Sequence, residues 1–252
     1  MLLLLCWNLV NNFRDLKIFL TYHVEPAMPS QTHGRTRKIV FRAIALLLVL
    51  LICGVLYDLY YPRTTRMREF DPDEVARLET AMWRSYYEKE RLQLFNQLAE
   101  LLRTQYGMSR LKSEQVAYYG ANAAFVFKQG KQRADYEKAL PDLLKFYEAI
   151  HKLSDIPFDV DRAARLELEW WIIHRQREQH APGDLAKALA ALQAEIYHVP
   201  VDRLLKHGQL RAEAMTIRDT KAENGGVTEA DWAHINELLK DSWRSLAQAV
   251  KS

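Results

Sequence analysis

The sequence predicts an all-α protein, with a single N-terminal transmembrane helix followed by a globular domain of about seven packed helices. Three observations support this fold class. An apolar run near the N-terminus has a 15-residue centre without charged residues, and apolar residues recur at helical spacing in the later chain. No segment alternates apolar and polar residues as a half-buried strand would. The helices are expected to form either repeat-like α-hairpins or an irregular bundle.

The apolar run, 39–61, is predicted to be a transmembrane helix that contacts the lipid bilayer. Ala43 to Tyr57 contains no charged residue. A helix over 39–61 would rise about 34 Å, enough for a hydrocarbon core of about 30 Å. Tyr60 and Tyr61 at its end suit the membrane interface. No small-x-small cleavage site follows, which favours an uncleaved anchor over a signal peptide, and a buried core helix is the alternative.

Basic residues on the two sides of this span predict its orientation. Four of them stand in an acid-free block next to the span on its N-terminal side, and three follow it on the other side. They are Arg35, Arg37, Lys38 and Arg42, then Arg63, Arg66 and Arg68. The positive-inside rule therefore favours a cytoplasmic N-terminus and an extracytoplasmic C-terminal domain, which would be periplasmic in a bacterium.

The rest of the chain divides by composition. Residues 1–38 are expected to be a disordered N-terminal arm, 62–70 a juxtamembrane linker, and 71–252 an all-α soluble domain. One interpretation of 1–27 is an over-extended start, because Met28 opens a short basic leader typical of membrane anchors. The alternative is a genuine N-terminal arm.

Charge and cysteine usage exclude several functional classes. The net charge of +3 is too small to indicate a nucleic-acid partner. Both cysteines, Cys6 and Cys53, precede the soluble domain, which therefore has neither a disulfide framework nor a CxxC metal site. The soluble domain also lacks GxSxG, HExxH and Gly-rich phosphate-loop motifs, and no cofactor is predicted.

Capping signals define the predicted helices. Asp71 and Pro72 suit the start of one long helix of about 33 residues, and Gly107 suits its stop. Thr228 and Asp231 form a capping-box pattern before the last helix. The helices after the first are expected near 113–129, 135–152, 160–180, 184–198, 201–222 and 228–250.

Similar helix starts recur at 47–49-residue intervals: "DYEKAL" near 135, "DLAKAL" near 184 and "ADWAHI" near 230. The stretch 121–150 resembles a tetratricopeptide unit, with small residues on a first helix, a Gly-containing turn and then "DYEKAL". It departs from that pattern in a longer turn, a proline after the Ala-Leu pair and a bulky Phe146. The resemblance implies α-hairpins and, by analogy, a protein partner.

Polar residues on apolar helix faces form the candidate site. Glu167 and His174 lie within the apolar arc of helix 160–180. A buried carboxylate needs a partner, and a buried arginine or amide is expected to face Glu167 rather than a metal. The full candidate buried polar centre is Glu79, Asn122, Glu167, His174, Arg211 and Asp219. The alternative is a set of separate buried pairs that serve only the fold.

Two Glu-x-x-His spacings, Glu148–His151 and Glu195–His198, are weak candidates for a metal site. Di-iron bundles use two such motifs with further glutamates. Here both motifs fall in the last turn of a predicted helix, where the helix dipole favours histidine without any metal.

These observations favour a membrane-anchored, non-catalytic protein-interaction or assembly module. The alternative is a helical-bundle enzyme, or a metal- or ligand-binding domain, whose site includes Glu167 and His174. Solvent access separates the two. A cavity that opens onto Glu167, His174 and Asp219 would favour the site, whereas a dry, paired network would favour the scaffold.

Overall fold

The computed structural model describes residues 32–61 and 63–251. The chain divides into two units, 1–51 and 52–252. The regular elements of the described part are all helices, and the only β-type pairing found there is an isolated bridge between Thr65 and Ser154. The all-α prediction is therefore confirmed. The proposals about residues 1–27 lie outside the described residues.

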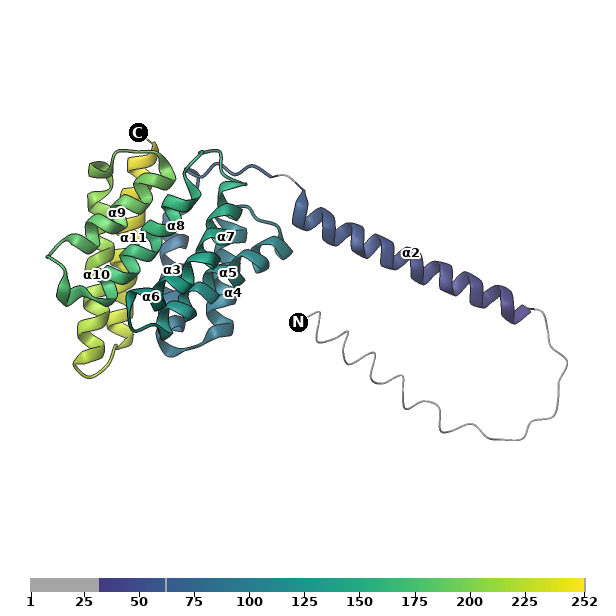
Figure 1. Cartoon of the computed structure of the whole chain (residues 1–252), viewed down its shortest axis with the longest axis horizontal. Coiled ribbons are helices and arrows are strands. Elements are labelled where there is room, and N and C mark those ends of the chain that lie inside the picture. The colour runs from purple at the N-terminus through teal and green to yellow at the C-terminus, as the bar shows by residue number, and fades with distance from the viewer. Residues whose placement is uncertain (1–31, 62, 252) are drawn as a thin grey trace. The chain divides into compact units, whose positions relative to one another are not determined.

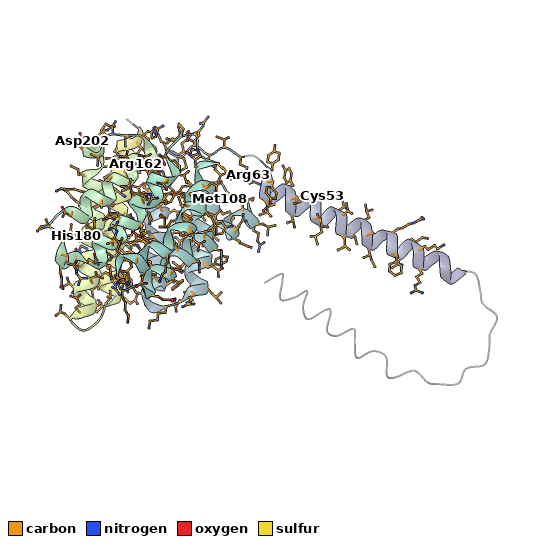
Figure 2. All side chains as sticks on the ribbon, viewed as in Figure 1. Cys53, Arg63, Met108, Arg162, His180 and Asp202 are labelled. Atoms are coloured by element: carbon orange, nitrogen blue, oxygen red, sulfur yellow. The ribbon has the colours of Figure 1, made fainter. Side chains whose placement is uncertain are left out.

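Helix α2, Thr32–Tyr60, contains the predicted membrane segment (Figure 1). Within it, Arg37–Tyr60 is long and apolar enough to cross a membrane, by length and composition. No residue of its most apolar window is buried, and Leu47, for example, is 66% exposed. Cys53, the one cysteine in the described part, also lies on α2 and is free (Figure 2). The helix begins at Thr32, so the described end of the predicted arm is helical.

Eight longer helices of the described part form a closed ring, because each packs on the next in chain order and the last packs on the first (Figure 1). They are α3 (Pro72–Glu88), α4 (Arg91–Thr104), α5 (Arg110–Gln129), α7 (Leu140–His151), α8 (Val160–Arg175), α9 (Asp184–Tyr197), α10 (Leu205–Glu223) and α11 (Glu229–Lys251). The short α6 (Arg133–Tyr136) and three 3-10 turns (Glu137–Ala139, Arg177–Gln179 and Val201–Leu204) lie in the connections.

The predicted single helix after Asp71 is wrong, because the chain breaks it into α3 and α4. Lys89 adopts a left-handed conformation with φ of 66°, and its N–H bonds back to the last turn of α3. A non-glycine residue seldom adopts this conformation, so the sequence carried no glycine or proline signal for the break. The ring consequently has eight long helices rather than about seven.

The predicted helix starts at Asp71 and Thr228 are confirmed by their capping bonds. The Asp71 carboxylate accepts hydrogen bonds from the N–H groups of Asp73 and Glu74 at 3.0 and 3.3 Å. Thr228 and Asp231 cap each other's backbone N–H groups at 2.9 and 3.2 Å. These bonds satisfy N–H groups that a helix leaves free in its first turn.

Residues 63–70, the described part of the predicted linker, pack across one end of the ring. The N–H of Thr65 bonds to Leu153 O at 2.7 Å, and Arg68 donates to Tyr197 O at 2.8 Å. The Thr65 hydroxyl donates to Tyr106 O at 2.6 Å. Tyr106 and Leu153 lie just beyond the last residues of α4 and α7, Thr104 and His151, and Tyr197 is the last residue of α9. The segment therefore crosses the end at which these three helices stop.

Helices α9 and α10 approach each other closely at Gly208. A Cβ atom there would collide with the carbonyl oxygen of Ala186. The neighbouring His207 is fully buried and bonds to Ser242 of α11. Because Gly208 has no side chain, α10 can pack closely against α9. The bond from His207 joins α10 to α11 on the other side.

Candidate functional site

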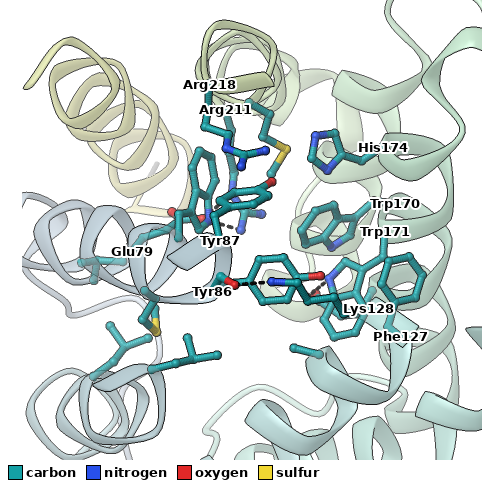
Figure 3. A pocket seen from close by; sticks show the side chains of 18 of the residues that line it. Glu79, Tyr86, Tyr87, Phe127, Lys128, Trp170, Trp171, His174, Arg211 and Arg218 are labelled. Atoms are coloured by element: carbon teal, nitrogen blue, oxygen red, sulfur yellow. Dashed lines mark hydrogen bonds and ion pairs between the residues drawn. The ribbon is translucent and has the colours of Figure 1, made fainter. Parts of the chain in front are cut away.

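The ring encloses a cavity of about 720 Å³, and all eight helices contribute side chains to its wall (Figure 3). Ten aromatic side chains line it, among them Trp83, Trp170, Trp171 and Trp243. Tightly packed protein interiors leave few voids larger than a water molecule. A space of this size with aromatic walls is typical of small-molecule binding sites, which occupy about 300–1,000 Å³.

The cavity is open at one end and covered at the other. Arg175, Arg177 and Glu223 line it and are exposed, so it reaches solvent where α8 and α10 end. Met67 also lines it but is only 4% exposed, and it belongs to the segment that crosses the opposite end of the ring. We call the solvent-exposed end, with Lys128, Arg175 and Arg218, the mouth.

Glu79 and Arg211 form a buried ion pair in the wall away from the mouth. Arg211 Nε donates to Glu79 Oε1 at 2.7 Å, and Trp243 Nε1 donates to Oε2 at 2.6 Å. Glu79 is 4% exposed, and the Arg211 guanidinium lies 5.1 Å from the ring centre of Trp170. Both carboxylate oxygens are thus satisfied, as a buried charge requires.

Glu167 lies on the same cavity with different partners from those expected. Tyr147 Oη donates to its Oε2 at 2.8 Å, and Trp171 Nε1 donates to Oε1 at 2.9 Å. Trp170 Nε1 lies near enough to lower the carboxyl pKa but makes no hydrogen bond of normal geometry. The net pKa of Glu167 is raised, because burial outweighs the nearby charge of Arg211. The expected arginine or amide is therefore not its direct partner.

His174 and Asp219 form a charged cluster with two arginines. His174 Nε2 lies 3.0 Å from Asp219 Oδ2, and Arg218 Nη1 donates to Oδ1 at 2.7 Å. Arg177 also reaches Oδ2, at 3.3 Å. Burial raises the pKa of Asp219, but the bonds from His174 and Arg218 together lower it by more than burial raises it. The net pKa is therefore below its usual value. His174, Arg177 and Asp219 also line a second cavity of about 310 Å³.

The cations at the mouth rest on aromatic rings. The Lys128 ammonium lies 4.2 Å from the ring centre of Tyr86 and donates to that residue's carbonyl oxygen. The Arg175 guanidinium lies 5.4 Å from the ring centre of Phe127. The pKa of Lys128 is lowered, first by burial and then by neighbouring positive charges. Within the described ranges, neither Lys128 nor Arg175 forms an ion pair with a carboxylate.

Five of the six predicted members of the polar centre therefore line one cavity, and Asn122 does not. Asn122 Nδ2 donates to Asp142 Oδ2 at 2.6 Å, between α5 and α7. The residues that sequence reasoning missed are Tyr147 and Trp243, which read as core aromatics, and Lys128, which read as part of a solvated helix face.

The weak metal candidates do not converge. Glu148 and Glu195 each pair with a basic side chain on the surface. His151 packs edge-on against Phe158 with ring centres 5.1 Å apart, and His198 is the left-handed residue that ends α9. The described part of the chain contains no group of three or more His, Cys, Asp and Glu side chains that could hold a metal ion.

Comparisons of the chain with protein-family models, with curated proteins and with solved structures found no match. Residues 121–150, which resemble a tetratricopeptide unit, span parts of α5 and α7 with α6 and a 3-10 turn between them.

Proposed function

We propose that this protein is a membrane-anchored ligand-binding domain, and that the cavity inside the helical ring holds a small molecule with a largely apolar body. The cavity volume carries the proposal. Its aromatic walls offer a ligand dispersion contacts and ring stacking, which water cannot supply. Trp170 lines the cavity and its Nε1 makes no hydrogen bond within the described chain, so this N–H is free to orient a polar group of the ligand.

Binding is favoured over catalysis by the chemistry of the lining. Among the described residues that border the cavity there is no serine, threonine or cysteine, so it offers none of the usual hydroxyl or thiol nucleophiles. The His174–Asp219 pair has the geometry of a general base and its orienting group. Its carboxylate is nevertheless shared with two arginines, which suits a fixed, charged wall better than a proton shuttle.

The expected protein-interaction module remains a prediction. The large exposed apolar side chains of the ring, Leu92, Tyr118 and Val201, belong to three different elements and form no groove that the described contacts reveal. Surface residues of this kind are common on soluble proteins. A protein partner therefore has less support than a small ligand.

The orientation remains part of this proposal, with α2 in the bilayer and the ring outside the cytoplasm. The support is the basic, acid-free stretch before the span. Ala233 is exposed, so the Ala233→Cys variant in a Cys6→Ser, Cys53→Ser background carries one surface thiol. A membrane-impermeant maleimide should label it from the extracytoplasmic side of intact cells. Labelling only after lysis would show that the ring lies in the cytoplasm, the opposite of the proposed orientation.

Calorimetric titration of the full chain tests the cavity. The chain would be placed in phosphatidylcholine nanodiscs, titrated with 2-naphthylmethanol, and compared with empty nanodiscs. One-to-one binding is expected. Ala124 borders the cavity, so Ala124→Trp should fill it and weaken binding by about tenfold or more, equivalent to about 1.4 kcal/mol.

The matched control is Ala233→Trp, which adds the same side chain on the exposed face of α11. It should bind as the unchanged chain does. Equal binding by the two tryptophan variants, or no binding above that of empty nanodiscs, would overturn the proposed function.

A further inference from the structure

We propose that the mouth of the cavity holds the anionic group of the ligand, so that the domain selects amphipathic anions over neutral or cationic molecules of the same shape. Lys128 and Arg175 would bind this group, and the apolar body would extend inward toward Trp170 and Trp171. The inference rests on the proposed function and adds to it the charge of the ligand.

The first observation is uncompensated positive charge. The positive charges of Lys89, Arg91, Arg175 and Arg218 lie close enough to Lys128 to lower its pKa, and in the described part of the chain neither Lys128 nor Arg175 forms an ion pair with a carboxylate. Like charges held together raise the free energy of the folded state. An anion bound between Lys128 and Arg175 would remove this repulsion, and it would also gain charge-assisted hydrogen bonds.

The second observation is the contrast with the other cations on the cavity. Arg211 has Glu79, Arg177 has Glu223, and Arg218 has Asp219 as ion-pair partners. Glu167 is held by Tyr147 and Trp171 and forms no ion pair with either mouth cation. The lining has five lysines and arginines against four carboxyl groups, and the surplus lies at the mouth.

Helix dipoles explain part of this arrangement but not its convergence. Lys128 and Arg175 occupy the last turns of α5 and α8, where positive charge is favourable. That effect acts on each helix separately and does not require the two side chains to border one cavity. Here both do. The Lys128 ammonium lies over the ring of Tyr86, which also lines the cavity (Figure 3). The Arg175 guanidinium lies over the ring of Phe127, another lining residue.

Three probes with one naphthyl body separate charge from shape: naphthalene-2-sulfonate, 2-naphthylmethanol and trimethyl(2-naphthyl)ammonium. Each would be titrated calorimetrically into the full chain in phosphatidylcholine nanodiscs. We expect the sulfonate to bind about tenfold more tightly than the alcohol, and the ammonium more weakly than both. Raising the salt concentration should reduce the affinity for the sulfonate and leave the affinity for the alcohol unchanged.

The variants Lys128→Met and Arg175→Gln should each reduce sulfonate affinity several-fold and leave alcohol affinity unchanged. Alcohol binding also reports whether each variant is folded. Arg103→Gln is the matched control, because Arg103 is exposed on α4 and does not line the cavity. It should alter neither affinity.

The outcomes distinguish the two proposals. If the alcohol and the sulfonate bind equally, the anion inference is overturned and the proposed function stands. A sulfonate preference that survives in the Lys128→Met, Arg175→Gln double variant would also overturn the inference, because the anion site would then lie elsewhere. If none of the three probes binds, both proposals fail.

Discussion

Two groups of charged residues face the same cavity but differ in how their charge is balanced. The inner pair, Glu79 and Arg211, is buried and its carboxylate is fully hydrogen-bonded. At the mouth, Lys128 and Arg175 form no ion pair with any described carboxylate. The difference suggests a division of labour: paired charges in the inner half maintain the fold, and unpaired charges at the mouth are available to a ligand.

The largest effect on stability is expected from Glu79→Gln. It would leave Arg211 buried without a counter-charge and should lower the free energy of unfolding by about 3–5 kcal/mol. Urea unfolding followed by circular dichroism measures the loss. Asp73→Asn is the matched control, since Asp73 lies on the same helix and pairs with Arg244 at the exposed surface. If Glu79→Gln lowers the free energy of unfolding no more than Asp73→Asn does, the inner pair does not stabilise the fold more than a surface pair. The contrast with the mouth would then fail.

The next effect concerns the close packing of the inner half. Gly208→Ala would place a methyl group against the backbone of Ala186 and force α9 and α10 apart, at a cost of about 1–3 kcal/mol. Gly120→Ala is a milder control, because the atoms nearest to its methyl group would belong to the side chains of Leu98 and Phe146 rather than to backbone, and the nearest is the end of Leu98. Equal unfolding midpoints for the two variants in urea would contradict the close approach.

The buried residue His207 makes the stability of the folded protein depend on pH. Burial lowers its pKa to about 3, from an ordinary value of 6.5, and its Nδ1 lies 3.1 Å from Ser242 O and 2.8 Å from Ser242 Oγ. The unfolded chain therefore binds a proton that the folded protein excludes, so stability present above pH 6.5 is lost as the pH falls. We expect a loss of about 2 kcal/mol between pH 7 and pH 5.

Urea unfolding at several pH values measures this slope. His207→Gln removes the titrating group and should flatten the pH dependence above pH 5, whatever its effect on absolute stability. Buried carboxylates such as Asp219 have lowered pKa values and contribute at lower pH. An unchanged slope in the variant would show that His207 is not the group responsible.

The smallest effect is expected at the mouth. Lys128→Met removes a cation that is repelled by its neighbours, so unfolding free energy should stay within about 0.5 kcal/mol of the original or increase. Thermal unfolding without ligand measures it. A large loss of stability would assign Lys128 to the fold and would narrow the contrast between the two groups.

The sequence predicted the helices and most of the inner polar residues because both follow local rules. Glu167 and His174 were recognisable as carboxyl and imidazole groups on an apolar helix face. Their partners were not, because Tyr147 resembles any core aromatic at helical spacing. The break at Lys89 carried no glycine or proline, and Asn122 found a partner, Asp142, outside the cavity.

Local sequence patterns could not predict that the ring closes or that the mouth cations border one cavity. The contact of α11 with α3 joins residues more than a hundred positions apart, as in the 2.6 Å bond from Trp243 to Glu79. Lys128 and Arg175 each look like an ordinary surface cation on its own helix. Only their position around a shared cavity distinguishes them.

The contact between α3 and α11 has a further consequence for how the chain can be connected. Asp73 near the start of α3 pairs with Arg244 near the end of α11, so the two ends of the ring are neighbours. A short peptide could join them, and a new start could be placed in any connection between helices without the loss of a single helix contact. The order of helices along the gene is thus one of several cyclic orders compatible with this ring.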